Sequence, residues 1–145
     1  MLDIPRTLSD KGEFKMNVKT TQKSFSNKEI MEKLQSLRPI LTQRNAIGYI
    51  AARNSRTLNE ALTEYKQFEQ DAIMRYGTAD VDENGRPLGT TSIRPESEGF
   101  QKFIEEMAPL QSIEQTLAIM VTKYEDVIGV LSGEEILAVD WMLED

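Results

Sequence analysis

A stripe of mostly apolar residues runs along residues 42–76 with a spacing close to the 3.6-residue period of an α-helix. Its members are Ile47, Ala51, Asn54, Leu58, Leu62, Tyr65, Glu69, Ala72 and Tyr76. A continuous helix of about 35 residues would extend on the order of 50 Å, which is longer than a compact domain of this size needs. We therefore predict a long central helix that ends at Gly77, a residue suited to a left-handed cap. Either it bends, at Gly48 or at Asn54-Ser55, or part of it projects and pairs with another protein or another copy.

The segment before this stripe divides into an arm and a first helix. Residues 1–24 mix charged residues with Thr, Ser, Gly and Pro and show no helical stripe, so we predict a flexible N-terminal arm. The first helix is predicted to begin at Ser26, because Ser26 and Glu29 have the spacing of a capping box. Pro39 should end this helix near Leu37, because proline clashes with the preceding helical turn.

The segment after the stripe has the pattern of a β-hairpin. Asn84-Gly85 stands between two short runs that contain β-forming residues, within residues 79–94. An Asn-Gly pair in this setting is typical of a two-residue turn of the primed type. Pro87 lacks a backbone N–H group and should confine its strand to the edge of a sheet.

Three further elements are predicted in the remainder of the chain. A helix is expected to start after Pro95, to bury Phe100, Phe103, Ile104 and Met107, and to end at Pro109. Residues 113–122 are rich in β-formers, which favours a strand even though a Ser-x-x-Gln cap pattern precedes them. A second capping box at Ser132 should start a C-terminal helix that packs through Trp141.

These elements together predict an α+β fold that is mostly α. It has a long central helix, a small antiparallel sheet seeded by the hairpin, and a C-terminal helix. A length of 145 residues fits one domain. We therefore expect a flexible arm over residues 1–24 and a single α-rich domain over residues 25–145.

The chain contains neither cysteine nor histidine, and this restricts its chemistry. The absence of both residue types excludes disulfides, thiolate nucleophiles, sulfur-ligated zinc sites and most catalytic triads. The sequence has no glycine-rich phosphate loop, nucleophile elbow or dinucleotide fingerprint. We therefore predict a protein that is not an enzyme, with no catalytic residue, no cofactor and no resident metal.

One motif is similar to a calcium loop. The run from Asp80 to Gly85 matches the first half of an EF-hand loop, with oxygen ligands at alternate positions. The second half does not match, because Thr91 stands where a bidentate glutamate is needed. We therefore interpret the motif as an acidic hairpin turn.

The net charge of −7 is unevenly distributed along the chain. Residues 1–78 carry 13 Lys and Arg against 9 Asp and Glu, whereas residues 79–145 carry 4 against 15. No aromatic platform accompanies the basic residues, and the acidic half would repel a nucleic acid, so we rank direct nucleic-acid association last among the alternatives. No stretch approaches the roughly 18 apolar residues of a membrane span, so we expect a cytoplasmic protein without membrane contact.

The long stripe is also the predicted binding surface. A helix of this length has more apolar surface than the other predicted elements can cover, so we expect a protein partner or a homo-oligomer. Aromatic and small residues near the distal end should be the anchors, and two arginines should lie at the rim. The predicted partner-binding residues are Arg53, Arg56, Tyr65, Phe68, Ala72 and Tyr76.

Three segments carry a resemblance to a known family. They are the capped helix at Ser26, the Asp-Glu-Asn-Gly turn at residues 82–85, and Leu-Ser-Gly-Glu-Glu-Ile-Leu-Ala at residues 131–138. Their order resembles an uncharacterised family of small proteins from phages and prophages of Gram-positive bacteria, over about residues 26–145.

The resemblance implies a non-enzymatic phage accessory protein that acts by protein–protein interaction in the cytoplasm of the host cell. Such a protein could be an inhibitor or adaptor that docks on a host defence protein. The alternative is a structural or assembly protein of the phage particle. The family provides no catalytic residues to compare with this chain.

Overall fold

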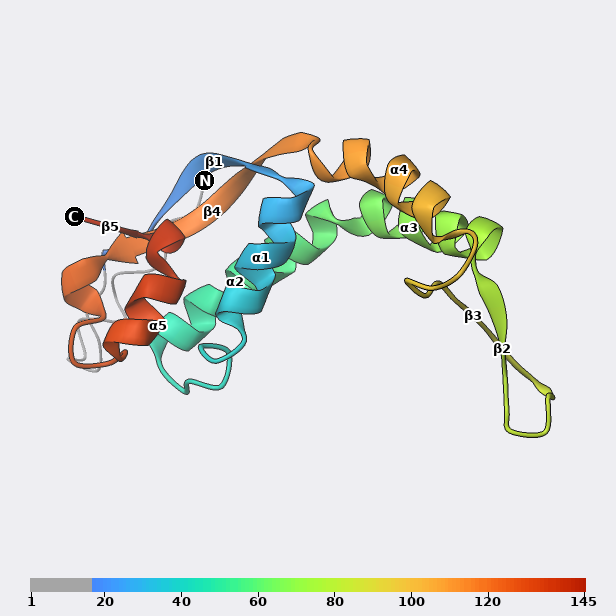
Figure 1. Ribbon diagram of the computed structural model, residues 1–145. Coiled ribbons are helices and arrows are strands. Elements are labelled where there is room, and N and C mark those ends of the chain that lie inside the picture. Colours follow the sequence, from blue (N-terminus) through green and yellow to red (C-terminus); the bar gives the residue numbers. More distant parts are fainter. Residues whose placement is uncertain (1–16) are drawn as a thin grey trace. The chain divides into compact units, whose positions relative to one another are not determined.

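The computed structural model describes residues 17–145, and the predicted arm lies outside the described residues over positions 1–16. The described chain forms two compact units. Unit 1 contains residues 17–61 and Glu114–Asp145, and unit 2 contains Leu62–Ile113. Helices and strands occur in both units (Figure 1), so the α+β class is confirmed. The single domain predicted over residues 25–145 contains both units.

Unit 1 contains a three-stranded sheet of order β1-β4-β5. Strand β1 (Lys19–Ser26) pairs antiparallel with β4 (Glu114–Lys123) along its whole length, from Lys19 opposite Val121 to Ser26 opposite Glu114. The short β5 (Leu143–Glu144) pairs parallel with the end of β4.

Two predictions concern these strands. The strand predicted over residues 113–122 is confirmed by β4. The arm predicted up to residue 24 is corrected over residues 19–24, which lie in β1. This segment is polar, because β1 has a sheet neighbour on one side only and most of its side chains are not buried. It therefore lacks the apolar alternation by which strands are predicted.

The helices of unit 1 begin where the capping residues predict. Helix α1 (Asn27–Leu37) starts after Ser26, whose hydroxyl accepts from the Glu29 N–H at 3.1 Å while Glu29 accepts from the Ser26 N–H at 2.8 Å. The same reciprocal pair starts α5 (Gly133–Ala138) after Ser132. Helix α1 ends at Leu37, two residues before Pro39, as predicted. Two 3₁₀ turns, η2 (Tyr124–Asp126) and η3 (Asp140–Met142), complete the unit.

Helix α2 (Ala46–Ala61) packs against β4 and builds the core of unit 1. Its buried apolar face consists of Ile47, Ile50, Ala51 and Leu58. Asn54 lies on this same face with only 1% of its surface exposed. Its amide group donates to the Met120 carbonyl at 2.9 Å and accepts from the Met120 N–H at 2.8 Å. The side chain therefore provides a partner for both backbone groups of Met120, a half-buried residue of β4.

The predicted long helix is divided at Leu62. Helix α2 ends at Ala61, and α3 (Thr63–Tyr76) begins two residues later. Leu62 itself has φ −88° and ψ 0°, outside the helical region, and no side chain caps α3. Within unit 1, the Gln115 amide donates to the Ala61 carbonyl at 2.8 Å, which satisfies an acceptor at the end of α2.

Two glycines have different roles from those predicted. Gly48 lies inside α2, where an added Cβ would come within 2.1 Å of the Gln43 carbonyl oxygen, so the glycine permits a close backbone approach. Gly77 follows α3 with φ −85° and ψ 179°, an extended conformation rather than the predicted left-handed cap. Here too the reason is space, since an added Cβ would lie 2.5 Å from the Ile73 carbonyl oxygen.

Unit 2 consists of α3, α4 (Phe100–Gln111), and a hairpin of β2 (Thr78–Val81) and β3 (Pro87–Ser92). The two helices run in opposite directions, because Tyr65 of α3 contacts Gln111 at one end of α4 and Tyr76 contacts Glu106 toward the other.

The predicted helix start near Pro95 and end at Pro109 are both corrected. Helix α4 begins at Phe100 and continues through Pro109, where the missing N–H group affects only the last turn. Of its predicted buried face, Met107 is buried, whereas Ile104 is exposed.

Within residues 17–145, no helix has both the length and the apolar composition needed to cross a membrane.

We predict that Asn54→Leu destabilises unit 1 by roughly 1–3 kcal/mol, because it removes the side-chain partner of the N–H and carbonyl groups of Met120, a half-buried residue. Urea unfolding followed by Trp141 fluorescence should show a lower midpoint with an unchanged slope. Asn59→Leu, at an exposed position of the same helix, is the control and should change the midpoint little. Equal stability of the Asn54 variant and the unaltered protein would contradict this role.

Candidate functional site

The predicted partner-binding residues do not form one surface. Tyr65 and Ala72 are buried in unit 2. Tyr76 is half-buried, and its hydroxyl donates to Glu106 of α4 at 3.1 Å. Three of the predicted anchors therefore contribute to the packing of unit 2 and are not free to bind a partner as proposed from the sequence.

The other three predicted residues are exposed. Phe68 lies on α3 with 55% of its surface exposed. Arg53 and Arg56 lie on the solvent side of α2 in unit 1, where Arg56 approaches Glu60 at 3.7 Å. The structure thus leaves one aromatic residue and two arginines available for binding.

Unit 2 exposes more large apolar side chains than it buries. Its buried apolar residues are Leu62, Tyr65, Ala72 and Met107. Its exposed large apolar residues are Phe68, Met74, Val81, Leu88, Ile104 and Ile113. These residues lie on α3, on both strands of the hairpin, on α4 and just after α4, so each element has to be considered separately as a possible binding surface.

The β2–β3 hairpin is the most prominent of these exposed elements. Figure 1 shows it extending away from α3 and α4, with its turn at the far end. Val81 of β2 and Leu88 of β3 are 54% and 58% exposed. The hairpin forms a two-stranded antiparallel sheet of its own, which confirms the small antiparallel sheet predicted around Asn84-Gly85. Within the described residues, each strand pairs only with the other, which leaves an outer edge on both.

The turn of the hairpin is longer than the predicted two-residue turn. A primed turn with Asn84 and Gly85 at its centre requires positive φ at both residues. Gly85 has φ +79°, but no non-glycine residue in the described chain has a positive φ. Instead the Asp82 carboxylate accepts from the N–H groups of Asn84 and Arg86, at 2.8 and 2.9 Å. The aspartate side chain therefore organises a wider loop, as in an Asx turn.

Asp80 joins the two strands of the hairpin. Its carboxylate accepts from the hydroxyls of Thr90 at 2.7 Å and Ser92 at 2.8 Å, and from the Arg94 guanidinium at 3.3 Å. The hydrogen bonds from Thr90 and Ser92, followed by the charge of Arg94, lower the pKa of this carboxyl below its ordinary value. The negative charge of Asp80 therefore holds the hairpin together.

The hydrogen bonds of Asp80 and Asp82 give these two aspartates a role in the hairpin other than the calcium binding that their spacing resembles. Asp80 and Asp82 both direct their oxygens to groups of the hairpin itself. Across residues 17–145, no group of three or more acidic side chains could hold a metal ion.

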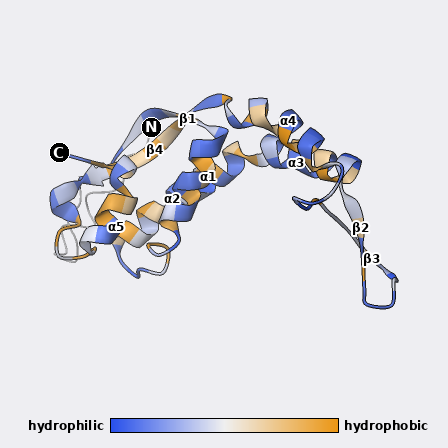
Figure 2. Cartoon of the chain, viewed as in Figure 1, coloured by the Kyte–Doolittle hydropathy of each residue, from blue (hydrophilic) through white to orange (hydrophobic). Residues whose placement is uncertain are grey.

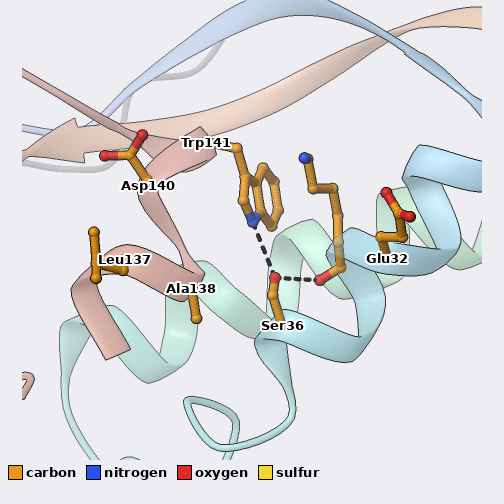
Figure 3. A pocket seen from close by; sticks show the side chains of 7 residues that line it. Glu32, Ser36, Leu137, Ala138, Asp140 and Trp141 are labelled. Carbon is orange, nitrogen blue, oxygen red and sulfur yellow. Dashed lines mark hydrogen bonds between the residues drawn. The ribbon is translucent and has the colours of Figure 1, made fainter. Parts of the chain in front are cut away.

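A hollow lies in unit 1 beside Trp141 (Figure 3). It has a volume of about 350 Å³ and is lined by Glu32, Lys33, Ser36, Leu137, Ala138, Asp140 and Trp141. The indole N–H donates to the Ser36 hydroxyl at 3.0 Å, and that hydroxyl donates to the Lys33 carbonyl at 2.6 Å. The indole N–H and the Ser36 hydroxyl therefore both donate to groups of the protein itself.

Trp141 was predicted to lie in the last helix and to pack from there, but it lies in the 3₁₀ turn η3. Its ring meets the edge of Phe25 at a centroid distance of 6.0 Å and an angle of 89°. Helix α5 ends before it, and its hydrophobic residues (orange in Figure 2) lie in its second half, after the acidic first turn, with Leu137 exposed by 77%. Trp141 therefore contributes to structure, and the hollow beside it has no free donor from the indole.

Comparison with known proteins finds no match to a protein-family model, a curated protein or a solved structure. The hairpin must therefore be judged by its geometry. Sequence reasoning predicted the hairpin but gave it no function. The available indication was Val81 and Leu88, two apolar residues that flank a charged turn.

We predict that the hairpin loses order at acidic pH because Asp80 becomes protonated. The pKa of Asp80 is lower in the folded hairpin than in the unfolded chain. Its contribution is therefore fully present above the ordinary aspartate pKa of about 3.9 and is lost as the pH falls through the folded value. NMR titration of the Asp80 carboxyl and of the Thr90 and Ser92 amides should show one shared transition below that ordinary value.

Asp80→Asn should remove this transition, whereas Glu83→Gln, in the exposed turn, should leave it in place. An Asp80 carboxyl that titrates at its ordinary value would contradict the structural role given to it.

Proposed function

We propose that this protein is a non-enzymatic phage accessory protein that binds a host protein through its β2–β3 hairpin, as an inhibitor or adaptor in the host cytoplasm. The observation that carries the proposal is a projecting hairpin that exposes Val81 and Leu88 and has two free edges. The phage origin rests on the resemblance in the order of sequence segments described above.

The order of the hairpin supports this function. A two-stranded hairpin is marginally stable in water on its own. Here the carboxylates of Asp80 and Asp82 fix the strands and the turn. An element that is ordered before it binds loses less conformational entropy on binding. The hairpin can therefore present Val81 and Leu88 in a fixed geometry.

The edges of the hairpin suggest how a partner would bind. An exposed strand edge offers backbone N–H and carbonyl groups to an extended segment of another protein. The apolar side chains would then enter pockets beside that segment and provide selectivity. We expect Val81 and Leu88 to be the anchors, since they are the exposed large apolar residues of the hairpin. Val81 pairs with Pro87, so Leu88 points to the opposite face, and the partner would contact both faces of the hairpin.

Site-specific photo-crosslinking in the bacterium that carries the gene tests the proposal. A photoreactive phenylalanine analogue at position 88 should capture one defined protein, because this side chain is expected to enter the partner. The same analogue at position 137 is the control, since Leu137 is more exposed to solvent than Leu88, 77% against 58%, but lies in unit 1. Val81→Thr should lower the capture from position 88 by at least about tenfold, because it removes an apolar contact and keeps a β-branched residue.

Equal capture from positions 88 and 137, or capture that Val81→Thr does not change, would count against the hairpin as the binding element. The identity of the captured protein separates the two functional classes. A host protein supports the inhibitor or adaptor, and a capsid or tail protein supports the assembly role.

A further inference from the structure

The outer side of α3 has the composition of a receptor for an arginine side chain. Phe68 is exposed on this helix, with Glu64 four residues before it and Asp71 three residues after it. Residues at these spacings are neighbours on one side of a helix, with Cβ atoms about 5–6 Å apart. Both carboxylates are exposed, and no cation in the described chain forms an ion pair with either.

An aromatic ring between two carboxylates suits a guanidinium group in particular. The planar cation stacks on the face of the ring, and its N–H groups donate to carboxylate oxygens at its edge. Unit 2 as a whole favours a cation, because it carries ten Asp and Glu against five Lys and Arg, a net charge of −5. Two of its own arginines, Arg75 and Arg94, are already paired with Glu106 and Asp80.

The same chain carries a matching arginine. Arg53 is exposed on the solvent side of α2, and no carboxylate in the described residues pairs with it. Tyr49 lies four residues before it and is half-exposed, and Arg56 lies three residues after it. On the outer side of α2, Tyr49 and Arg56 thus stand four residues before and three residues after Arg53. On α3, Glu64 and Asp71 stand at the same spacings around Phe68, so the positive surface of α2 matches the negative surface of α3.

We propose that two copies of this protein associate, with Arg53 of one copy stacked on Phe68 of the other, between Glu64 and Asp71. Arg56 and Tyr49 lie on either side of this contact and extend it. The contact joins two different surfaces, so it is heterologous, and each copy carries one of each kind. It uses neither Val81 nor Leu88, so it is independent of the hairpin function proposed above.

Sedimentation velocity over a range of protein concentrations and at low and high salt tests the proposal. The unaltered protein should associate with increasing concentration, and more weakly at high salt, because exposed charges are screened. Phe68→Ser should weaken association by at least about tenfold, because it removes the stacking surface. Leu88→Ser is the matched control, since Leu88 is 58% exposed on the hairpin of the same unit, which this contact does not use.

A charge exchange between two variants gives the sharpest test. One variant carries Arg53→Glu and Arg56→Glu, and the other carries Glu64→Lys and Asp71→Lys. Each should be monomeric alone, because its two surfaces then have charge of the same sign. An equimolar mixture should associate again, since each surface in one variant meets an opposite charge in the other. Arg53→Lys should associate more weakly than the unaltered protein, because an ammonium group lacks the planar fork of guanidinium.

A protein that stays monomeric at all concentrations in low salt would overturn the proposal. So would association that survives in both charge variants or is not restored in their mixture, since it would then use another surface. Capture of a different protein by a photoreactive residue at position 68, without capture of a second copy, would show that α3 binds another arginine-bearing partner and would also overturn it.

Discussion

The hydrogen bonds between Asn54 and Met120 are the contact on which unit 1 depends. Strand β4 is long, but β5 pairs with only its last two residues, so Met120 has no strand on that side. A buried backbone without partners would cost more than the surrounding apolar contacts of one residue provide. Asn54 of α2 supplies both a donor and an acceptor to Met120, and thus makes the two hydrogen bonds that a neighbouring strand would otherwise make. The helix and the strand are thereby locked at one relative position.

Acidic side chains have two distinct uses in this chain. Glu29, Glu135, Asp80 and Asp82 accept from nearby N–H or hydroxyl groups and define where a helix starts or how a hairpin turns. Glu64 and Asp71 lie exposed on α3 and form no ion pair within the described residues, although Asp71 accepts from the Gln67 amide at 3.1 Å. A composition count treats both kinds alike, which is why the strongly negative second half of the sequence gave no position for a binding surface.

Local features were predictable from the sequence. Both capping boxes, the end of α1 before Pro39, the hairpin at Gly85 and strand β4 follow from residues close to one another in the chain. The division at Leu62 was not predictable, because the apolar stripe continues in phase on both sides of it. Strand β1 was missed for the opposite reason, since its order comes from pairing with a segment about 95 residues away.

The candidate site shows the same limit. The apolar stripe correctly indicated that Tyr65, Ala72 and Tyr76 need to be covered, but α4 of the same unit covers them, and this helix is remote in sequence. Only Phe68, at the edge of the stripe, stays exposed among the predicted anchors on α3. Whether an apolar residue meets its own chain or another molecule depends on tertiary packing, which periodicity does not encode.

Unit 2 is an insertion within unit 1, because the chain leaves unit 1 after Ala61 and returns at Glu114. The hydrogen bond from Gln115 to the Ala61 carbonyl shows that the points of exit and return are adjacent. A short loop can therefore join them without disturbing α2 or β4, as is usual where one folded module is inserted into another. Selection can in this way lengthen, replace or remove the part that carries the hairpin while the sheet and its helices keep their sequence. The architecture therefore places the proposed binding element in a unit that is separate in the chain from the sheet and helices of unit 1.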